Sequence, residues 1–477
     1  MRARTLIASL LLLLPTACKL GPNYKRPALS VPDQYRGVAP PVTGQQSSQP
    51  AAQPPRPGES FGDMKWFTVF QDETLQALIK EALTNNYDIR IAAARILEAN
   101  ANVGIVRANQ FPTLNGSFAI NNVRSEPLFS HANSGTEPTF DTALLQLDYI
   151  VDFWGKYRRA TEAARAQLLG TEYGQDVVRT SLVASVANSY FQLRAFDDQL
   201  AVSKQTLEGD NEIVRINTIK FKGGESAITD VLQAELLQQQ AEAEIISLNQ
   251  GIEQTENQIS VLLGRNPGPI LRGTSLTQQT HLPEIPAGLP SAILERRPDI
   301  RQAEQNLVAY NANVGVAKAA FFPQLELTGI FGASSTALTS FLQGPATVWA
   351  LGGQVAQPIF QGGRIRSNYR LAWAQRDQAD LEYKQTVQRA FGDVSNSLVG
   401  YSQSRLYRME IQKQTDTYKQ TADLANVRFL GGYTAFLEVL VTQQQYFTSA
   451  INLDQAWLTE LQNYVGLYQA LGGGWQQ

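Results

Sequence analysis

The chain has 477 residues and a near-neutral charge, with 40 basic and 43 acidic side chains. The basic residues form no sustained block, so the composition argues against nucleic acid as a partner. Cys18 is the only cysteine of the sequence, which excludes an intramolecular disulfide.

The first residues predict an exported protein. Residues 1–17 have a basic start, continue with the apolar run Leu6–Leu14 and end in small residues before Cys18, as signal peptides do. The apolar run is too short to span a bilayer. The arrangement resembles a bacterial lipobox, in which the cysteine becomes the acylated first residue, although the last leucine lies one position further from the cysteine than is usual. We therefore expect lipidation at Cys18.

Residues 18–60 are expected to form a lipid-anchored N-terminal segment that ends in a tether. Ala39–Ser60 is rich in proline, glutamine and serine and has few large apolar residues, so it cannot build a core. After the signal peptide, no segment approaches about 20 consecutive apolar residues, the length of a transmembrane helix. Any entry of the chain into a membrane would therefore need a β-barrel.

A long internal repeat organises the rest of the sequence. Asp88–Leu114 reads DIRIAAARILEANANVGIVRANQFPTL, and Asp299–Leu325 reads DIRQAEQNLVAYNANVGVAKAAFFPQL. Similar matches follow along the chain at a nearly constant offset. We predict a first repeat, a proline-rich connector, a second repeat and a short C-terminal tail, over residues 61–264, 265–290, 291–472 and 473–477.

Each repeat is expected to contain long helices. Between Ile245 and Leu262, an apolar residue or a threonine recurs at alternating steps of three and four, which is a heptad seam. Other helices of unusual length are expected over residues 170–221, 364–428 and 434–471. Such helices pack side by side along narrow apolar stripes.

Alternating residues predict four β-strands, at about 111–121, 140–149, 323–332 and 346–356. Each is about ten residues long, which is enough to cross an outer membrane when tilted. The polar loops 122–139 and 332–345 would face outside. A closed membrane barrel needs at least about eight strands, so one chain cannot close it. Several copies must share one barrel, most simply in cyclic symmetry.

Three motifs of the chain are similar to those of a known family. Ile285–Ser291 reads IPAGLPS, Leu294–Arg301 reads LERRPDIR, and Gly21–Tyr24 reads GPNY, three residues after the cysteine. These residues resemble the TolC-like outer-membrane efflux factors, and specifically their lipoprotein branch.

The resemblance implies an α+β membrane protein, in which a long α-helical barrel continues a transmembrane β-barrel shared among three protomers. It implies a homotrimer that is lipid-anchored in the bacterial outer membrane, extends into the periplasm, and works with a periplasmic adaptor protein and an inner-membrane pump. The channel would passively conduct drugs or other small molecules to the outside. The alternative is an exit duct for type I protein secretion or metal-ion export; with 3 methionines in the chain, a copper or silver route is disfavoured.

Two glycine pairs are expected to form turns between helices. Gly223 and Gly224 interrupt one long helical run, and Gly431 and Gly432 interrupt the equivalent run of the second repeat. Glycine permits the positive φ that a tight helix-to-helix turn demands. The resemblance places both turns at the inner tip of the tunnel, where the adaptor makes contact.

Asp230 and Glu438 are equivalent across the repeat and are the candidate gate ring. Many relatives carry an aspartate one turn further on, where this chain has Gln233 and Val441. A ring of carboxylates facing the lumen would favour cations. The alternative is that an acid in the first turn of a helix stabilises the helix dipole, by about 0.3–1 kcal/mol, regardless of any pore.

Other classes of protein fit less well. His131 and His281 lack a paired ligand pattern, and no nucleophile, metal or phosphate-binding motif is evident, so we expect no enzyme, no cofactor and no resident metal. Gly472–Gly474 is expected to cap a helix. A purely structural periplasmic coiled coil would not need the alternating strands.

Overall fold

The computed structural model of the protein describes residues 19–32, 34–35, 60–122, 139–279, 290–336, 341 and 343–475. The expected signal peptide, Cys18, most of the expected tether and of the first outer loop, His131 and His281 lie outside these residues. The chain forms two compact units, each described here by itself. Unit 1 comprises Met1–Ala28, Arg95–Thr171 and Gln302–Tyr383, and unit 2 comprises Leu29–Ala94, Glu172–Arg301 and Lys384–Gln477.

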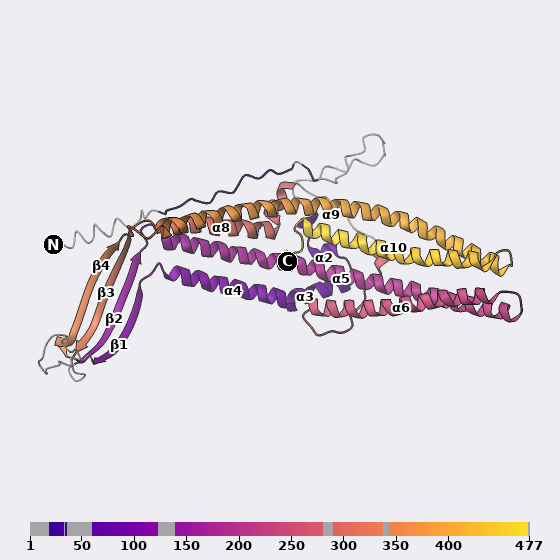
Figure 1. The fold of residues 1–477 in the computed structure, drawn as a ribbon, viewed down its shortest axis with the longest axis horizontal. Helices are drawn as coiled ribbons and strands as arrows, with labels where there is room; N and C mark the ends of the chain where they lie inside the picture. The colour runs from indigo at the N-terminus through magenta and orange to yellow at the C-terminus, as the bar shows by residue number, and fades with distance from the viewer. Residues whose placement is uncertain are drawn as a thin grey trace. The chain divides into compact units, whose positions relative to one another are not determined.

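Unit 1 contains an antiparallel sheet with the strand order β1-β2-β3-β4 (Figure 1). Its strands are β1 Thr113–Asn122, β2 Thr139–Val151, β3 Gln324–Ser335 and β4 Thr347–Ala356. The first strand begins two residues later than expected, because Pro112 has no N–H to donate to a ladder. The third continues three residues beyond its expected end, because β2 supplies pairing partners as far as Asp141.

One face of this sheet is apolar and exposed. Leu114, Leu147, Gly329 and Leu351 lie in register across the four strands, and 82% of Leu351 is exposed. Phe118, Leu145, Leu327, Phe331, Trp349 and Val355 are further exposed apolar residues of the strands. The alternating positions on the opposite face are mostly small or polar. This is the period-two pattern that the sequence predicts.

Six helices form three pairs of equal length. They are α4 Tyr87–Ala108 and α8 Pro298–Ala319 with 22 residues each, α5 Lys156–Lys222 and α9 Arg364–Leu430 with 67 each, and α6 Ile228–Leu262 and α10 Phe436–Ala470 with 35 each. The only proline in these helices is Pro298, at the first position of α8, where the missing N–H costs nothing. No helix within the described ranges is long and apolar enough to cross a membrane.

The expected long helices are present, with shifted ends. α5 begins at Lys156 rather than at Gly170, because no helix breaker stands between the two positions. α10 begins at Phe436, two residues later than expected. On α6 the expected seam is buried at Leu248 and Ile259, so this stripe does pack against neighbouring helices.

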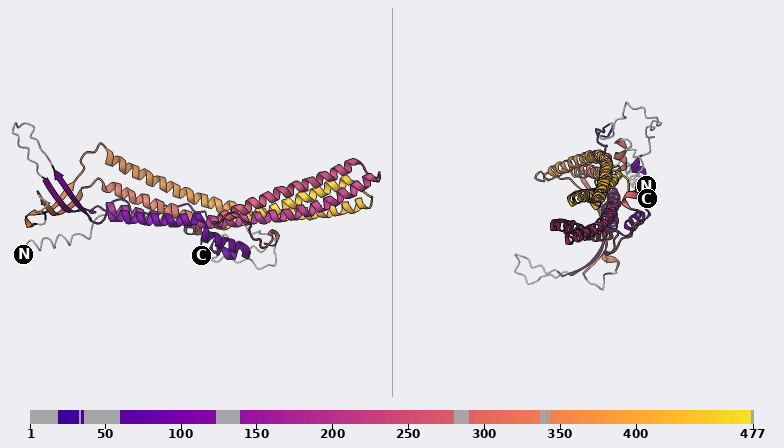
Figure 2. Two further views of the ribbon diagram at one scale, coloured as in Figure 1. Left: turned by 90° about the horizontal axis from the view of Figure 1, so that it is seen from below. Right: turned by 90° about the vertical axis from the view of Figure 1, so that its right-hand side faces the viewer.

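In unit 2, α5, α6, α9 and α10 run alongside one another towards two turns (Figure 2). Near the C-terminal end of α10 lie the short elements η2 Phe61–Asp63 and α2 Trp66–Val69, followed along the chain by α3 Glu73–Asn85. The ring of Phe61 is fully buried, with its centroid 5.0 Å from that of Tyr464 and 5.3 Å from that of Tyr468. An aromatic core therefore fixes the base of the helices that carry the turns.

Candidate functional site

The two helix-to-helix turns of unit 2 have the same backbone geometry. The N–H of Gly224 donates to the carbonyl of Phe221 over 3.0 Å, and the N–H of Glu225 donates to that of Lys220 over 2.8 Å. The second turn repeats both bonds one repeat later, from Gly432 and Tyr433, at 3.0 and 2.8 Å. Each is a Schellman motif, which satisfies the last carbonyls of a helix.

Only the second glycine of each pair has a backbone conformation that demands glycine. Gly224 has φ +79° and Gly432 has φ +74°, whereas Gly223 and Gly431 do not have positive φ. At Gly431, the first glycine of the second turn, steric crowding favours glycine, because a Cβ there would come within 2.9 Å of the ring of Tyr433.

The two turns are adjacent and share one apolar cluster. The rings of Phe429 and Phe436 pack at a tilt of 53° with their centroids 5.6 Å apart, and Ile213, Ala234, Ala425 and Val439 are buried with them. The Nζ of Lys220, at the end of α5, lies 4.0 Å from the centroid of the Phe429 ring. This distance is well within the range of a cation–π interaction. The tip is therefore held together by contacts between both repeats.

The candidate gate residues Asp230 and Glu438 have different surroundings. The carboxylate of Glu438 accepts a 3.0 Å hydrogen bond from Nη1 of Arg428 and another from the hydroxyl of Thr434. Asp230 is half-buried, and no ion pair or side-chain hydrogen bond to it is seen in the described part of the chain. Lys220 holds the position in the first repeat that Arg428 holds in the second, but it contacts Phe429 instead of Asp230.

A second constellation in unit 1 holds the residues that follow Cys18. We call Lys19–Arg26 the strap. Arg159, in the first turn of α5, is 1% exposed. Its guanidinium donates to the carbonyls of Leu20 and Gly21, over 3.0 and 3.3 Å, and to Oδ1 of Asn23 over 2.8 Å. A buried arginine thus binds the strap at three points.

Helix α8 provides the other contacts of the strap. Glu304 accepts hydrogen bonds from the hydroxyl of Tyr24, over 3.0 Å, and from Nη2 of Arg26, over 2.6 Å. Burial, together with the neighbouring Glu304 carboxylate, raises the pKa of Tyr24, so this hydroxyl stays a donor. Gly21 has φ +95°, and a Cβ there would lie 2.4 Å from the Cα of Gly315. The GPNY motif therefore has a structural role in this chain.

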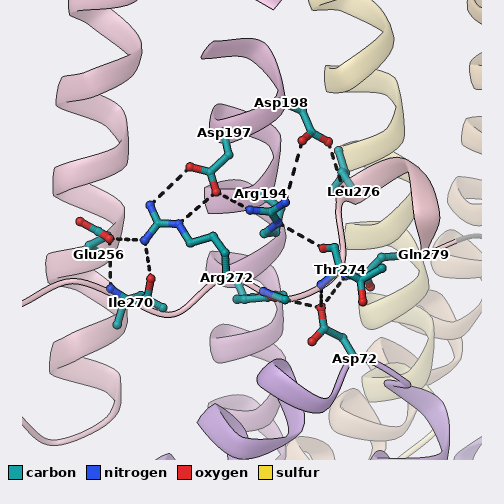
Figure 3. Close-up of polar contacts among 12 residues, drawn as sticks. Asp72, Arg194, Asp197, Asp198, Glu256, Ile270, Arg272, Thr274, Leu276 and Gln279 are labelled. Atoms are coloured by element: carbon teal, nitrogen blue, oxygen red, sulfur yellow. Dashed lines mark hydrogen bonds and ion pairs between the residues drawn. The ribbon is translucent and has the colours of Figure 1, made fainter. Parts of the chain in front are cut away.

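The expected connector is also bound to the helices of unit 2 (Figure 3). Arg272 pairs with Asp197 of α5 over 3.1 Å and with Glu256 of α6. Buried Asp72 caps α3 and accepts hydrogen bonds from the hydroxyl of Tyr190 and the N–H of Thr274, both over 2.9 Å. The carboxylates of Asp197, Glu256 and Asp72 are thus already ion-paired or hydrogen-bonded within the protein.

No group of residues that could hold a metal ion is found among the residues that the structure describes. Gly472, with φ +83°, caps α10 as expected, and the N–H of Gly473 donates to the carbonyl of Tyr468 over 3.0 Å. Sequence reasoning missed Arg159 and Arg272. Only the GPNY motif pointed towards the strap, and it did not name the partners.

A sheet with an exposed apolar face, combined with paired helices of 67 residues, is the architecture of an outer-membrane channel subunit. The chain belongs to the outer membrane efflux protein family, whose model matches residues 78–265 and 289–473. This confirms the family expected from the sequence, and with it the location in the outer membrane.

Relatives match the chain over nearly its full length. It is 33% identical to the solvent efflux pump outer membrane protein SrpC of Pseudomonas putida over 469 residues, 97% of each protein. It is 31% identical to the cation efflux system protein CusC of Escherichia coli O6:H1, again over 97% of each. The solved structure of the outer-membrane channel OprN superposes with a TM-score of 0.85 at 26% identity, covering 96% of this chain and all of that one. The expected fold class is confirmed by this likeness.

Proposed function

We propose that three copies of the chain form one outer-membrane channel, which works with a periplasmic adaptor protein and an inner-membrane pump. The open sheet of unit 1 carries this proposal. β1 and β4 are its edges, and their backbone groups need partners in a bilayer. Further copies of the chain supply those partners when they are arranged in a closed ring.

The mass of the protein purified from outer membranes tests the assembly, and planar-bilayer recordings test the channel. We expect a trimer that conducts ions. A conducting particle of another stoichiometry would overturn the trimer, and a trimer that does not conduct would overturn the channel.

Small molecules are the proposed cargo, and they cross the channel without any catalytic step by this chain. The family supports export, and the name of SrpC refers to solvents. Metal export is the second candidate, since the name of CusC refers to cations; type I protein secretion is another. A strain lacking the gene, tested with and without a plasmid copy, separates these cargoes by its sensitivity to organic solvents, drugs, copper and silver. Loss of a secreted protein without any change in these sensitivities would favour the secretion duct.

Cys18 is the proposed site of lipidation. The sequence before it and the strap directly after it support an anchor that is held close to unit 1. Mass spectrometry of the mature N-terminus should show a diacylglyceryl cysteine, and Cys18→Ser should impair sorting more than folding. A mature N-terminus at another residue would contradict this assignment.

The paired turns of unit 2 are the proposed adaptor contact, and Asp230 and Glu438 the proposed gate ring. Equal helix lengths in the two halves support a chain made of two repeats, each contributing one turn. Cross-linking from a cysteine introduced at exposed Glu225 should capture the adaptor. Capture that is equally efficient from exposed Lys204 would contradict the assignment to the turn.

A further inference from the structure

A basic cavity of about 450 Å³ lies in unit 1 between the strap, α4, α5 and α8. Its charged lining residues are Lys19, Arg107, Arg158, Glu162 and Arg165. Ala166, Leu169 and Val308 form an apolar part of the wall. The charged lining of the cavity is therefore predominantly basic, which is the complement of a phosphate group.

The charge of the cavity is not cancelled from within. Glu162 is its one acid, and it already pairs with Lys19 over 2.5 Å and with Arg159 over 3.0 Å. Burial opposes the ionisation of Glu162, but these two cations outweigh it and lower the pKa of the carboxyl. Arg107 and Arg165 are exposed and form no ion pair within the described ranges. Two guanidinium groups thus remain available for an anion.

The depth of the cavity follows from the aromatic residues at the strand ends. Phe111 precedes β1, and Phe153 and Trp154 follow β2, with Phe111 56% and Phe153 47% exposed. Aromatic side chains at the ends of membrane strands mark the level of the headgroups. Arg107 lies one helical turn before Phe111, roughly 6 Å along a helix. Arg107, and Arg158 in the first turn of α5, therefore lie close to the level of the phosphates on the periplasmic side.

We propose that this cavity binds the phosphate headgroup of an anionic phospholipid from the periplasmic leaflet of the outer membrane. The proposal rests on the proposed function as an outer-membrane channel. Arginine binds phosphate through two parallel N–H groups, and basic pockets at a membrane surface select anionic lipids. Since Lys19 follows Cys18, the bound lipid lies beside the anchor.

Native mass spectrometry of the full-length trimer tests the site, with phosphatidylglycerol and phosphatidylcholine added in turn to the detergent solution. We expect the wild type to retain phosphatidylglycerol preferentially. Arg107→Gln combined with Arg165→Gln should weaken this binding by about tenfold or more, since each basic residue near a membrane surface contributes measurably. Arg366→Gln combined with Arg370→Gln is the matched control, because these arginines of α9 are exposed, equally charged and outside the cavity.

Three results would overturn the proposal: no preference in the wild type, an equal loss in the control variant, or displacement of the lipid by an equal concentration of glycerol phosphate. The last would reveal a general anion site. Bilayer conductance of the same preparations distinguishes the proposed channel function from the proposed lipid site. A conducting trimer without a lipid preference contradicts only the lipid site. If the double variant does not assemble, Arg165→Gln alone provides the comparison, because its exposed side chain has no ion pair within the described ranges.

Discussion

Arg428 pairs with Glu438 over 3.0 Å, whereas its counterpart Lys220 contacts the ring of Phe429, and no cation of the described residues pairs with Asp230. The negative charge is therefore compensated at Glu438 but not at Asp230. The sequence repeat suggested that they are equivalent. The structure makes Asp230 the stronger candidate for an influence on ions.

Asp230→Asn should consequently lower the cation preference of the channel more than the paired change Glu438→Gln with Arg428→Gln does, because the paired change removes one negative and one positive charge together. Reversal potentials in planar bilayers under a salt gradient measure this preference, and the variant with all three substitutions should resemble Asp230→Asn alone. Should the permeability ratio stay unchanged in all three variants, only the helix-dipole role would remain, with a stability loss of about 0.3–1 kcal/mol.

The stability of the protein should fall as the pH rises from about 4 to about 7, because of Asp454 on α10. This side chain is 6% exposed, and its Oδ2 has no hydrogen-bond partner among the described residues. Burial, with a smaller effect of the nearby Asp198, raises the pKa of Asp454 to about 7. The folded state therefore keeps a proton that the unfolded chain releases at lower pH.

Asp454→Asn should reduce this pH dependence, although burial also raises the pKa of Asp210, to about 6. It should stabilise the protein at about pH 8 by at most about 4 kcal/mol, since one pKa unit corresponds to about 1.4 kcal/mol. Thermal unfolding followed between about pH 4 and about pH 8 measures the effect. Asp416→Asn, at an exposed position of α9, is the control. An unchanged slope in Asp454→Asn would show that this carboxyl ionises freely in the folded protein.

Arg159→Met should release the strap. The substitution leaves the carbonyls of Leu20 and Gly21 and the carboxylate of Glu162 without their buried partner, a loss of about 3–5 kcal/mol in comparable sites. Hydrogen exchange of the strap amides should become fast, while that of β2 stays slow. Arg366→Met, at an exposed site of α9, should leave the strap protected. Slow exchange in Arg159→Met would mean that the contacts from α8 suffice.

Arginine on the apolar face of the sheet should reduce trimer assembly. Leu147→Arg and Leu327→Arg each place a charge on this face, at about 2–4 kcal/mol at mid-depth of a bilayer. Thr328→Arg, on the opposite face and paired in register with Asp148, should be milder. The fraction of heat-dissociable trimer in outer-membrane extracts measures assembly. Equal assembly of all three variants would mean that the exposed face does not contact lipid.

Local patterns were sufficient to predict the four strands and the four longest helices of this fold. The strands were predictable because one face is apolar throughout, so that Leu114, Phe118 and their neighbours alternate with polar residues. The long helices were predictable because they contain no internal proline and carry narrow apolar stripes. The predicted ends of these helices were less accurate. α5 begins at Lys156 rather than at Gly170, because the local sequence between the two positions carries no clear start signal.

The sites were only partly predictable, because their partners are distant in the sequence. Arg159 stands in an arginine- and alanine-rich stretch that reads as a solvated helix, and its burial depends on a strap 139 residues earlier. Arg272 lies in a segment that reads as a simple connector, yet it joins α5 and α6. The difference between Asp230 and Glu438 arises from the side chains of Lys220 and Thr434, which a comparison of equivalent positions does not weigh.

The strap also sets an order of events during biogenesis. Its residues are synthesised first, but Arg159, Glu304 and Gly315, which hold them, follow only after more than a hundred further residues. A segment with such distant partners cannot dock before α5 and α8 have met, because closing the long loop early gains too few contacts to offset its entropy. The strap therefore docks only after α5 and α8 have met, and an ordered strap reports that these two helices are in place.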